Sequence, residues 1–122
     1  MNKIIEKENI ENMIYEIRGK QVMLDSDLAR LYECKNGTKT INQAVKRHIN
    51  KFPNRYMFRI TESEFKTICG HNLGPQASKV RSMPYVFTEQ GVAMLATILK
   101  TPVADIISIK VIDAFVYMRK YI

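Results

Sequence analysis

Hydrophobic and polar residues alternate in two short stretches near the start of the chain. The first stretch places Tyr15 and Ile17 on one face, and the second does the same with Val22 and Leu24. Strict alternation of this kind is typical of β-strands. Gly19 lies between the two stretches and is suited to a tight turn. The pattern therefore predicts a β-hairpin that turns at Gly19.

The next two stretches have the spacing of helices. Asp25 is a good N-cap for a first helix that extends to about Glu33, and Asn-Gly chemistry at Gly37 predicts a turn after it. A second helix is predicted over residues 40–52, because Pro53 forbids its continuation. Its apolar positions recur with a period of 3.6 residues and are expected to face the core. They are Ile41, Ala44, Val45, His48, Ile49 and Phe52.

The second half of the chain alternates short strands with helices. A strand is predicted around Phe58, followed by a capping box between Thr61 and Glu64 that starts a helix of about two turns. A returning strand over residues 85–87 precedes a helix capped by Thr88. A last helix follows Pro102 and extends to about Tyr121. The expected class is α+β, with a small antiparallel sheet, a winged helix-turn-helix-like core and a long C-terminal helix.

The length fits one domain over residues 1–122, with residues 1–12 as a flexible or helical N-terminal extension. The first residues mix both charge signs and lack the apolar centre of a secretory signal, which predicts a cytoplasmic protein.

The basic residues are concentrated in the middle of the chain. The 122 residues carry 19 Lys and Arg against 12 Asp and Glu, a net charge of +7. No Asp or Glu occurs from Cys34 to Thr61, where seven Lys and Arg residues occur. Such a one-sided run is typical of a surface that binds a polyanion. Nucleic acid is expected rather than a membrane, because the longest apolar stretch, Gly91–Leu99, is far shorter than the ~20 residues of a bilayer span.

Two helices joined by a compact turn, the second of them basic and amphipathic, match the helix-turn-helix plan. Opposite the apolar stripe lie side chains that suit base reading in the major groove: Asn42, Gln43, Lys46, Arg47 and Asn50. Three flanking cations are expected to contact phosphates: Lys39, Lys51 and Arg55. The alternative is the solvated face of an ordinary helix, but no acidic residue interrupts this one.

The polar loop from Gly70 to Pro84 carries Lys79 and Arg81 without an acid. It lies between two predicted strands, as the wing of a winged helix-turn-helix protein does, and is expected either to contact DNA or to be a flexible connection.

No metal, cofactor or catalytic site is expected. The candidate ligands match no zinc spacing, and a disulfide is not expected; they are Cys34, His48, Cys69 and His71. The sequence contains no nucleophile with a nearby base and no phosphate-binding glycine loop, so an enzyme is not expected.

The last helix is apolar on more than one side. Besides a stripe that begins at Val103, a second stripe comprises Ile109, Ile112 and Val116. A small monomer has little with which to cover both faces, which favours a homodimer or a partner protein at the second stripe. A helix wrapped centrally in the core explains the pattern equally well.

Three blocks of sequence carry a family resemblance. They are IRGKQVMLD at residues 17–25, INQAVKR at residues 41–47 and PYVFTEQGVAML at residues 84–95. With them, the chain resembles the phage "ORF-six N-terminal" domain family, a relative of the KilA-N and Bro-N domains, over roughly residues 10–120. Glu33 departs from the pattern, since many members have Gly there.

The resemblance implies a DNA-binding-type module of phage or prophage regulatory proteins that resemble antirepressors. It also implies that Asn42, Lys46 and Arg47 are the leading contacts. The preferred interpretation is sequence-specific duplex DNA binding through residues 40–52. The alternative is a protein-interaction module that sequesters a regulator through the apolar last helix, and RNA binding is a weaker third possibility.

Overall fold

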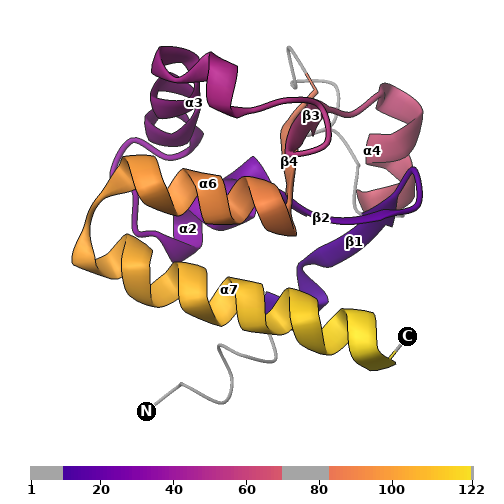
Figure 1. The fold of residues 1–122 in the computed structure, drawn as a ribbon. Coiled ribbons are helices and arrows are strands. Elements are labelled where there is room, and N and C mark those ends of the chain that lie inside the picture. The colour runs from indigo at the N-terminus through magenta and orange to yellow at the C-terminus, as the bar shows by residue number, and fades with distance from the viewer. Residues whose placement is uncertain (1–9, 70–82, 122) are drawn as a thin grey trace.

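A computed structural model describes residues 10–69 and 83–121 of the chain. The elements, in chain order, are β1 (Ile14–Ile17), β2 (Lys20–Leu24), α2 (Asp25–Leu31), α3 (Thr38–Arg47), the 3-10 turn η1 (Ile49–Lys51), β3 (Met57–Arg59), α4 (Glu62–Cys69), β4 (Tyr85–Thr88), α6 (Glu89–Leu99) and α7 (Pro102–Tyr121). The predicted α+β class with a long C-terminal helix is confirmed (Figure 1).

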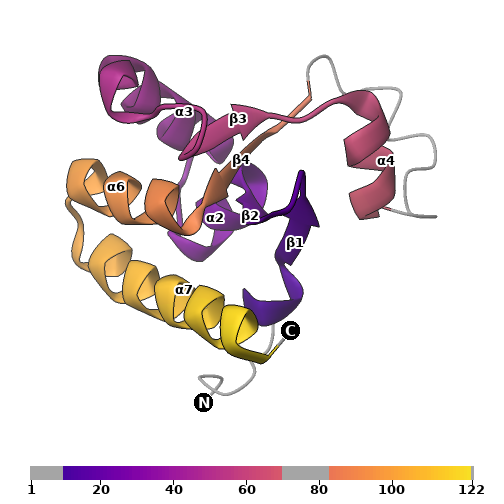
Figure 2. The same ribbon diagram turned by 45° about the vertical axis from the view of Figure 1, so that its right-hand side comes forward.

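The four strands form one antiparallel sheet in the order β1-β2-β4-β3. Its register aligns Met23, Phe87 and Met57 in one row, and this row belongs to the larger buried cluster. The α6 and α7 helices pack on this face, while α4 covers the opposite face around Phe58 (Figure 2). The sheet therefore lies between α4 on one face and a layer of α2, α3, α6 and α7 on the other.

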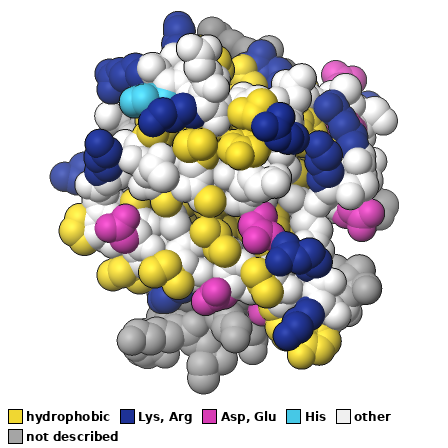
Figure 3. Space-filling view, viewed as in Figure 1, with side chains coloured by type: hydrophobic (Ala, Val, Ile, Leu, Met, Phe, Trp, Pro, Cys, Tyr) yellow, Lys and Arg dark blue, Asp and Glu magenta, His cyan; other side chains and the backbone are white. Residues whose placement is uncertain are grey.

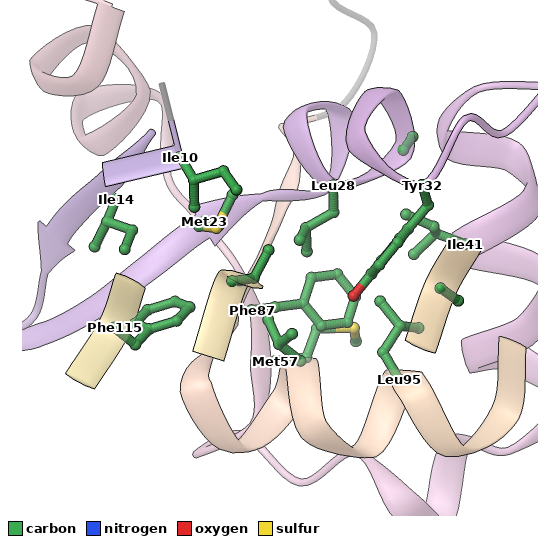
Figure 4. Packing of buried hydrophobic residues seen from close by; sticks show 14 of the residues in the cluster. Ile10, Ile14, Met23, Leu28, Tyr32, Ile41, Met57, Phe87, Leu95 and Phe115 are labelled. Carbon is green, nitrogen blue, oxygen red and sulfur yellow. The ribbon is translucent and has the colours of Figure 1, made fainter. Parts of the chain in front are cut away.

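The larger core joins elements that are far apart in the sequence. Leu28 and Tyr32, at the α2 end, converge with Ile41 of α3 and Leu95 of α6 on Phe87 (Figure 4). The Tyr32 hydroxyl lies 2.9 Å from that of Ser108 on α7, a buried hydrogen bond between two otherwise apolar surfaces. Burial raises the pKa of Tyr32 to about 12, so this hydroxyl stays protonated.

Three local predictions are confirmed. The hairpin turns at Arg18 and Gly19, both with positive φ, as a two-residue type I′ turn requires. The amide of Thr61 donates to Glu64 Oε1 at 2.8 Å, while the amide of Glu64 donates to Thr61 Oγ1 at 3.2 Å, which completes the capping box. The Thr88 hydroxyl caps α6 by accepting from the amide of Gly91 at 3.2 Å.

The predicted N-cap role of Asp25 is wrong. Leu24 occupies the N-cap without a side-chain hydrogen bond, and Asp25 is the first residue of α2. Asp25 is only 4% exposed, because its carboxylate turns inward and accepts from the backbone amide of Tyr85 at 3.4 Å.

The second helix is shorter than the predicted range of 40–52, since α3 ends at Arg47. The ring Nδ1 of His48 is 2.9 Å from the carbonyl oxygen of Ala44, which is the acceptor that the His48 amide would use in a continuing α-helix. The His48 amide donates instead to Val45, and a 3-10 turn follows. His48 and Ile49 are therefore exposed, and their predicted place in the core is wrong.

In the last helix, a single stripe is buried rather than two. Its members are Ala104, Ser108, Val111, Ala114 and Phe115. Ile106, which continues the stripe that begins at Val103, is 57% exposed, so its predicted place on a buried face is wrong. The small residues of this stripe, Ala104, Ser108 and Ala114, allow α7 to lie close to α6, while Ile109 and Val116 face outward.

Candidate nucleic-acid interface

The α3 helix is fixed to the core by one narrow apolar stripe. Ile41 and Val45 are its buried residues, and Phe52, just beyond η1, meets the ring of Phe87 edge-on with centroids 6.1 Å apart. α3 also packs against α2 and α6. The opposite side of α3 is therefore held in a fixed orientation toward solvent.

That side carries exposed cations and amides. Lys39, Gln43, Lys46 and Arg47 are exposed on α3, and Asn50 and Lys51 are exposed on η1. Among the described residues, none of these cations forms an ion pair. Figure 3 shows Lys and Arg side chains around the histidine over α3, with no Asp or Glu visible in that part of this face. We call the six exposed residues the α3 face.

Asn42 does not lie on this face with its predicted neighbours. It is half-buried, and its side chain hydrogen-bonds to the inward-turned Asp25 carboxylate. Burial raises the pKa of Asp25, while the amides of Tyr85 and Ser26 and the Asn42 side chain partly oppose that rise. The Asn42 Oδ1 atom is buried and has no hydrogen-bond partner in the described part of the chain. An unmatched buried acceptor of this kind costs about 1–3 kcal/mol.

The remaining predicted nucleic-acid contacts lie elsewhere. Arg55 is exposed beside the Tyr56 ring, with the guanidinium 5.4 Å from the ring centroid. It lines a cavity of about 580 Å³ together with Lys20 and Arg119, at the tip of the hairpin and the end of α7. Lys79 and Arg81 lie outside the described residues, as does most of the predicted wing.

Two arginines that the sequence analysis did not assign to the site make specific contacts. Arg18 is engaged with Glu64 through two hydrogen bonds of 2.8 and 3.0 Å, and its guanidinium lies over Phe58. The pair lowers the pKa of Glu64 to about 2, with the Thr61 amide as the next cause. Arg59 lies over Tyr85 at 4.4 Å from the ring centroid. Neither contact has a signal in the local sequence, because the partners are far apart along the chain.

The predicted partner surface on α7 is largely open. Ile109 is 64% exposed and Val116 is 36% exposed, while Ile112 is half-buried against the core. Ile106, Tyr117 and Tyr121 are also exposed on this helix.

Residues 10–69 and 83–121 contain no group of three His, Cys, Asp or Glu placed to hold a metal ion. Cys34 and Cys69 are free thiols. In the same ranges, no helix is both long and apolar enough to cross a membrane.

These features define a small α+β domain that presents a basic helical face at one end of a four-stranded sheet. The chain belongs to the phage-associated ORF6N domain family, whose model matches residues 12–98. The resemblance noted in the sequence is thereby confirmed. No curated protein matches the chain significantly, and no solved structure does.

Proposed function

We propose that this domain binds duplex DNA by placing the α3 face in the major groove. The observation that carries the proposal is the group of four exposed cations, Lys39, Lys46, Arg47 and Lys51, without an acidic partner among the described residues. An ordinary solvated helix face mixes charges of both signs. In helix-turn-helix proteins, Lys and Arg side chains beside the recognition helix contact phosphates and fix its position on the duplex.

Within this proposal, sequence is read by Gln43, Arg47 and Asn50. Gln and Asn match adenine, and Arg matches guanine, through paired hydrogen bonds that each discriminate by about 1–3 kcal/mol. The other cations position the domain on the backbone. We propose that its role in the cell is that of a phage or prophage regulator that acts in the cytoplasm by binding rather than by catalysis, and membership of a phage-associated family supports this role.

The test is binding of the protein to a labelled random-sequence duplex at several salt concentrations, monitored by fluorescence anisotropy. On a random-sequence duplex binding is essentially electrostatic, so Arg47 also counts as a phosphate contact; four contacts predict a slope of log affinity against log salt of roughly −3.6, at about 0.9 per phosphate. The double variant Lys46→Ala/Arg47→Ala should halve this slope to roughly −1.8. A matched control, Lys66→Ala/Lys120→Ala, removes two exposed cations from α4 and α7 and should leave the slope unchanged. Equal slopes for the two double variants would contradict the assignment.

A second candidate function rests on α7. The exposed Ile106, Ile109 and Val116 form an apolar strip that suits a second copy of the domain or a regulator protein. Ile109→Ser/Val116→Ser should then shift the protein toward monomer in sedimentation equilibrium, or abolish capture of the regulator, while duplex binding by the α3 face persists. A monomeric parent protein that captures no regulator would leave this function without support.

A further inference from the structure

A second cavity, of about 280 Å³, lies beside the α3 face. It is formed where the first residues of α2 and α3 meet β3 and the start of β4. Its lining includes Asp25, Asn42, Arg59, Phe65 and Tyr85. Cavities of about 300–1,000 Å³ hold drug-sized molecules. A cavity at the lower edge of that range is suited to a single planar group such as one nucleobase.

Two of the polar residues that line the cavity, Asn42 and Asp25, can accept hydrogen bonds, beside the Ser26 and Thr38 hydroxyls and the Arg59 guanidinium. Asn42 lines the cavity, and its Oδ1 is a buried acceptor without a partner among the described residues, while its side chain also hydrogen-bonds to Asp25. The Asp25 carboxylate accepts from the Tyr85 amide at 3.4 Å, from the Ser26 amide and from the Asn42 side chain, which leaves one of its about four acceptor positions for a ligand. Two neighbouring acceptor groups are best matched by a ligand that carries two neighbouring N–H donors.

The apolar lining is flat. The Tyr85 ring is half-buried, and the Arg59 guanidinium covers one of its faces at 4.4 Å from the centroid. The Phe65 side chain, from α4, is also half-buried at the cavity. Aromatic rings and guanidinium planes are the groups on which proteins stack unpaired bases.

We propose that this cavity binds one unstacked guanine base of a nucleic acid strand that lies along the α3 face. Guanine presents N1–H and N2–H₂ side by side on its Watson–Crick edge, whereas adenine and cytosine present a single amino group beside an acceptor nitrogen. Thymine presents one N–H between two carbonyls. The proposal rests on nucleic-acid binding by the α3 face, because the adjacent cations hold the phosphates of the same strand.

Free nucleotides test the cavity without requiring duplex binding. Titration of the ¹⁵N-labelled protein with dGMP should move the amide signals of Asp25, Asn42 and Tyr85, with at least tenfold higher affinity than dTMP. dIMP lacks the N2 amino group and should bind several-fold more weakly than dGMP to the unaltered protein. Equal affinities for dGMP, dIMP and dTMP, or shifts confined to other residues, would overturn the proposal.

Variants distinguish dGMP binding in the cavity from duplex binding by the α3 face. Asn42→Ala should remove the preference for dGMP, while Asn54→Ala, which removes an exposed amide outside the cavity lining and outside the α3 face, should preserve it. Lys46→Ala/Arg47→Ala should lose duplex affinity and keep the dGMP shifts at the cavity. If duplex binding fails in the parent protein while the cavity still selects dGMP, the proposed function fails and the guanine site stands as a free-nucleotide site.

The source of the base is decided by a duplex with one unpaired nucleotide. A bulged guanine should raise affinity about tenfold over a bulged thymine, and Asn42→Ala should cancel the difference. If the protein binds dGMP selectively but binds both bulged duplexes equally, the proposal that the bound guanine belongs to a nucleic acid strand is refuted.

Discussion

Substitution of Gly91 by alanine should destabilise the fold, although alanine favours helices. Gly91 lies in the first turn of α6, and a Cβ atom there would lie 2.0 Å from the carbonyl oxygen of Tyr56 and 2.9 Å from its carbonyl carbon. That carbonyl cannot retreat freely, because it accepts from the Thr88 amide at 3.0 Å and the Thr88 hydroxyl at 3.2 Å. Relief of the clash therefore disturbs the cap of α6 as well.

The opposing effects can be compared in magnitude. Replacing glycine by alanine in a helix gains about 1 kcal/mol, whereas overpacking costs about 1–3 kcal/mol and loss of a cap about 1 kcal/mol more. We expect Gly91→Ala to lower the free energy of unfolding by roughly 2 kcal/mol, which corresponds to roughly 8 °C in Tm for a domain of this size.

Urea unfolding monitored by circular dichroism measures this difference in the free energy of unfolding. Ala93→Gly serves as a matched control at an exposed position of the same helix, where only propensity acts and a loss of about 1 kcal/mol is expected. If Gly91→Ala is as stable as the parent protein or more stable, the close approach of α6 to Tyr56 is refuted.

Three further predictions concern charge and backbone strain. Arg18→Gln should raise the pKa of Glu64 from about 2 toward its usual value, which carboxyl NMR titration measures. Because a lowered carboxyl pKa gives stability that is lost as the pH falls toward 2, the variant should lack this pH-dependent loss. For Asp25 the sign is opposite, because burial raises its pKa and the parent protein therefore loses stability as the pH rises through the acid range. Asp25→Asn should abolish this loss of the free energy of unfolding, measured by urea unfolding. Glu33 has a φ of 59°, so Glu33→Gly should stabilise by about 0.5 kcal/mol in the same assay, whereas Glu33→Ala should not.

The elements that the sequence predicted correctly depend on local chemistry. The hairpin needs only Gly19 and alternating residues on either side. The α4 and α6 starts need only a threonine hydroxyl and the amide three residues later, at Glu64 and at Gly91. Such signals act within one turn of chain, so no knowledge of the distant packing is needed to find them.

The errors arise where a polar side chain bonds to a group that its position in the hydrophobic pattern does not indicate. Asp25 is a favourable N-cap by sequence, but an amide from β4, sixty residues away, takes its carboxylate. Asn42 has the spacing of the exposed face, yet Asp25 draws its amide inward. His48 has the spacing of the core, but its ring ends α3 by bonding to Ala44. In each case a polar side chain finds a partner that apolar periodicity does not describe.

The Thr88–Gly91 block, which contributes no cation to the α3 face, nevertheless supports that face. The Thr88 hydroxyl donates to the carbonyl of Arg55 at 2.9 Å, while Phe87, the preceding residue, packs on Phe52. These contacts fix the chain where it leaves η1, and the space that Gly91 leaves open allows α6 to approach that segment. The family block therefore acts through packing and backbone hydrogen bonds, and the orientation of α3 depends on residues that lie outside the proposed interface.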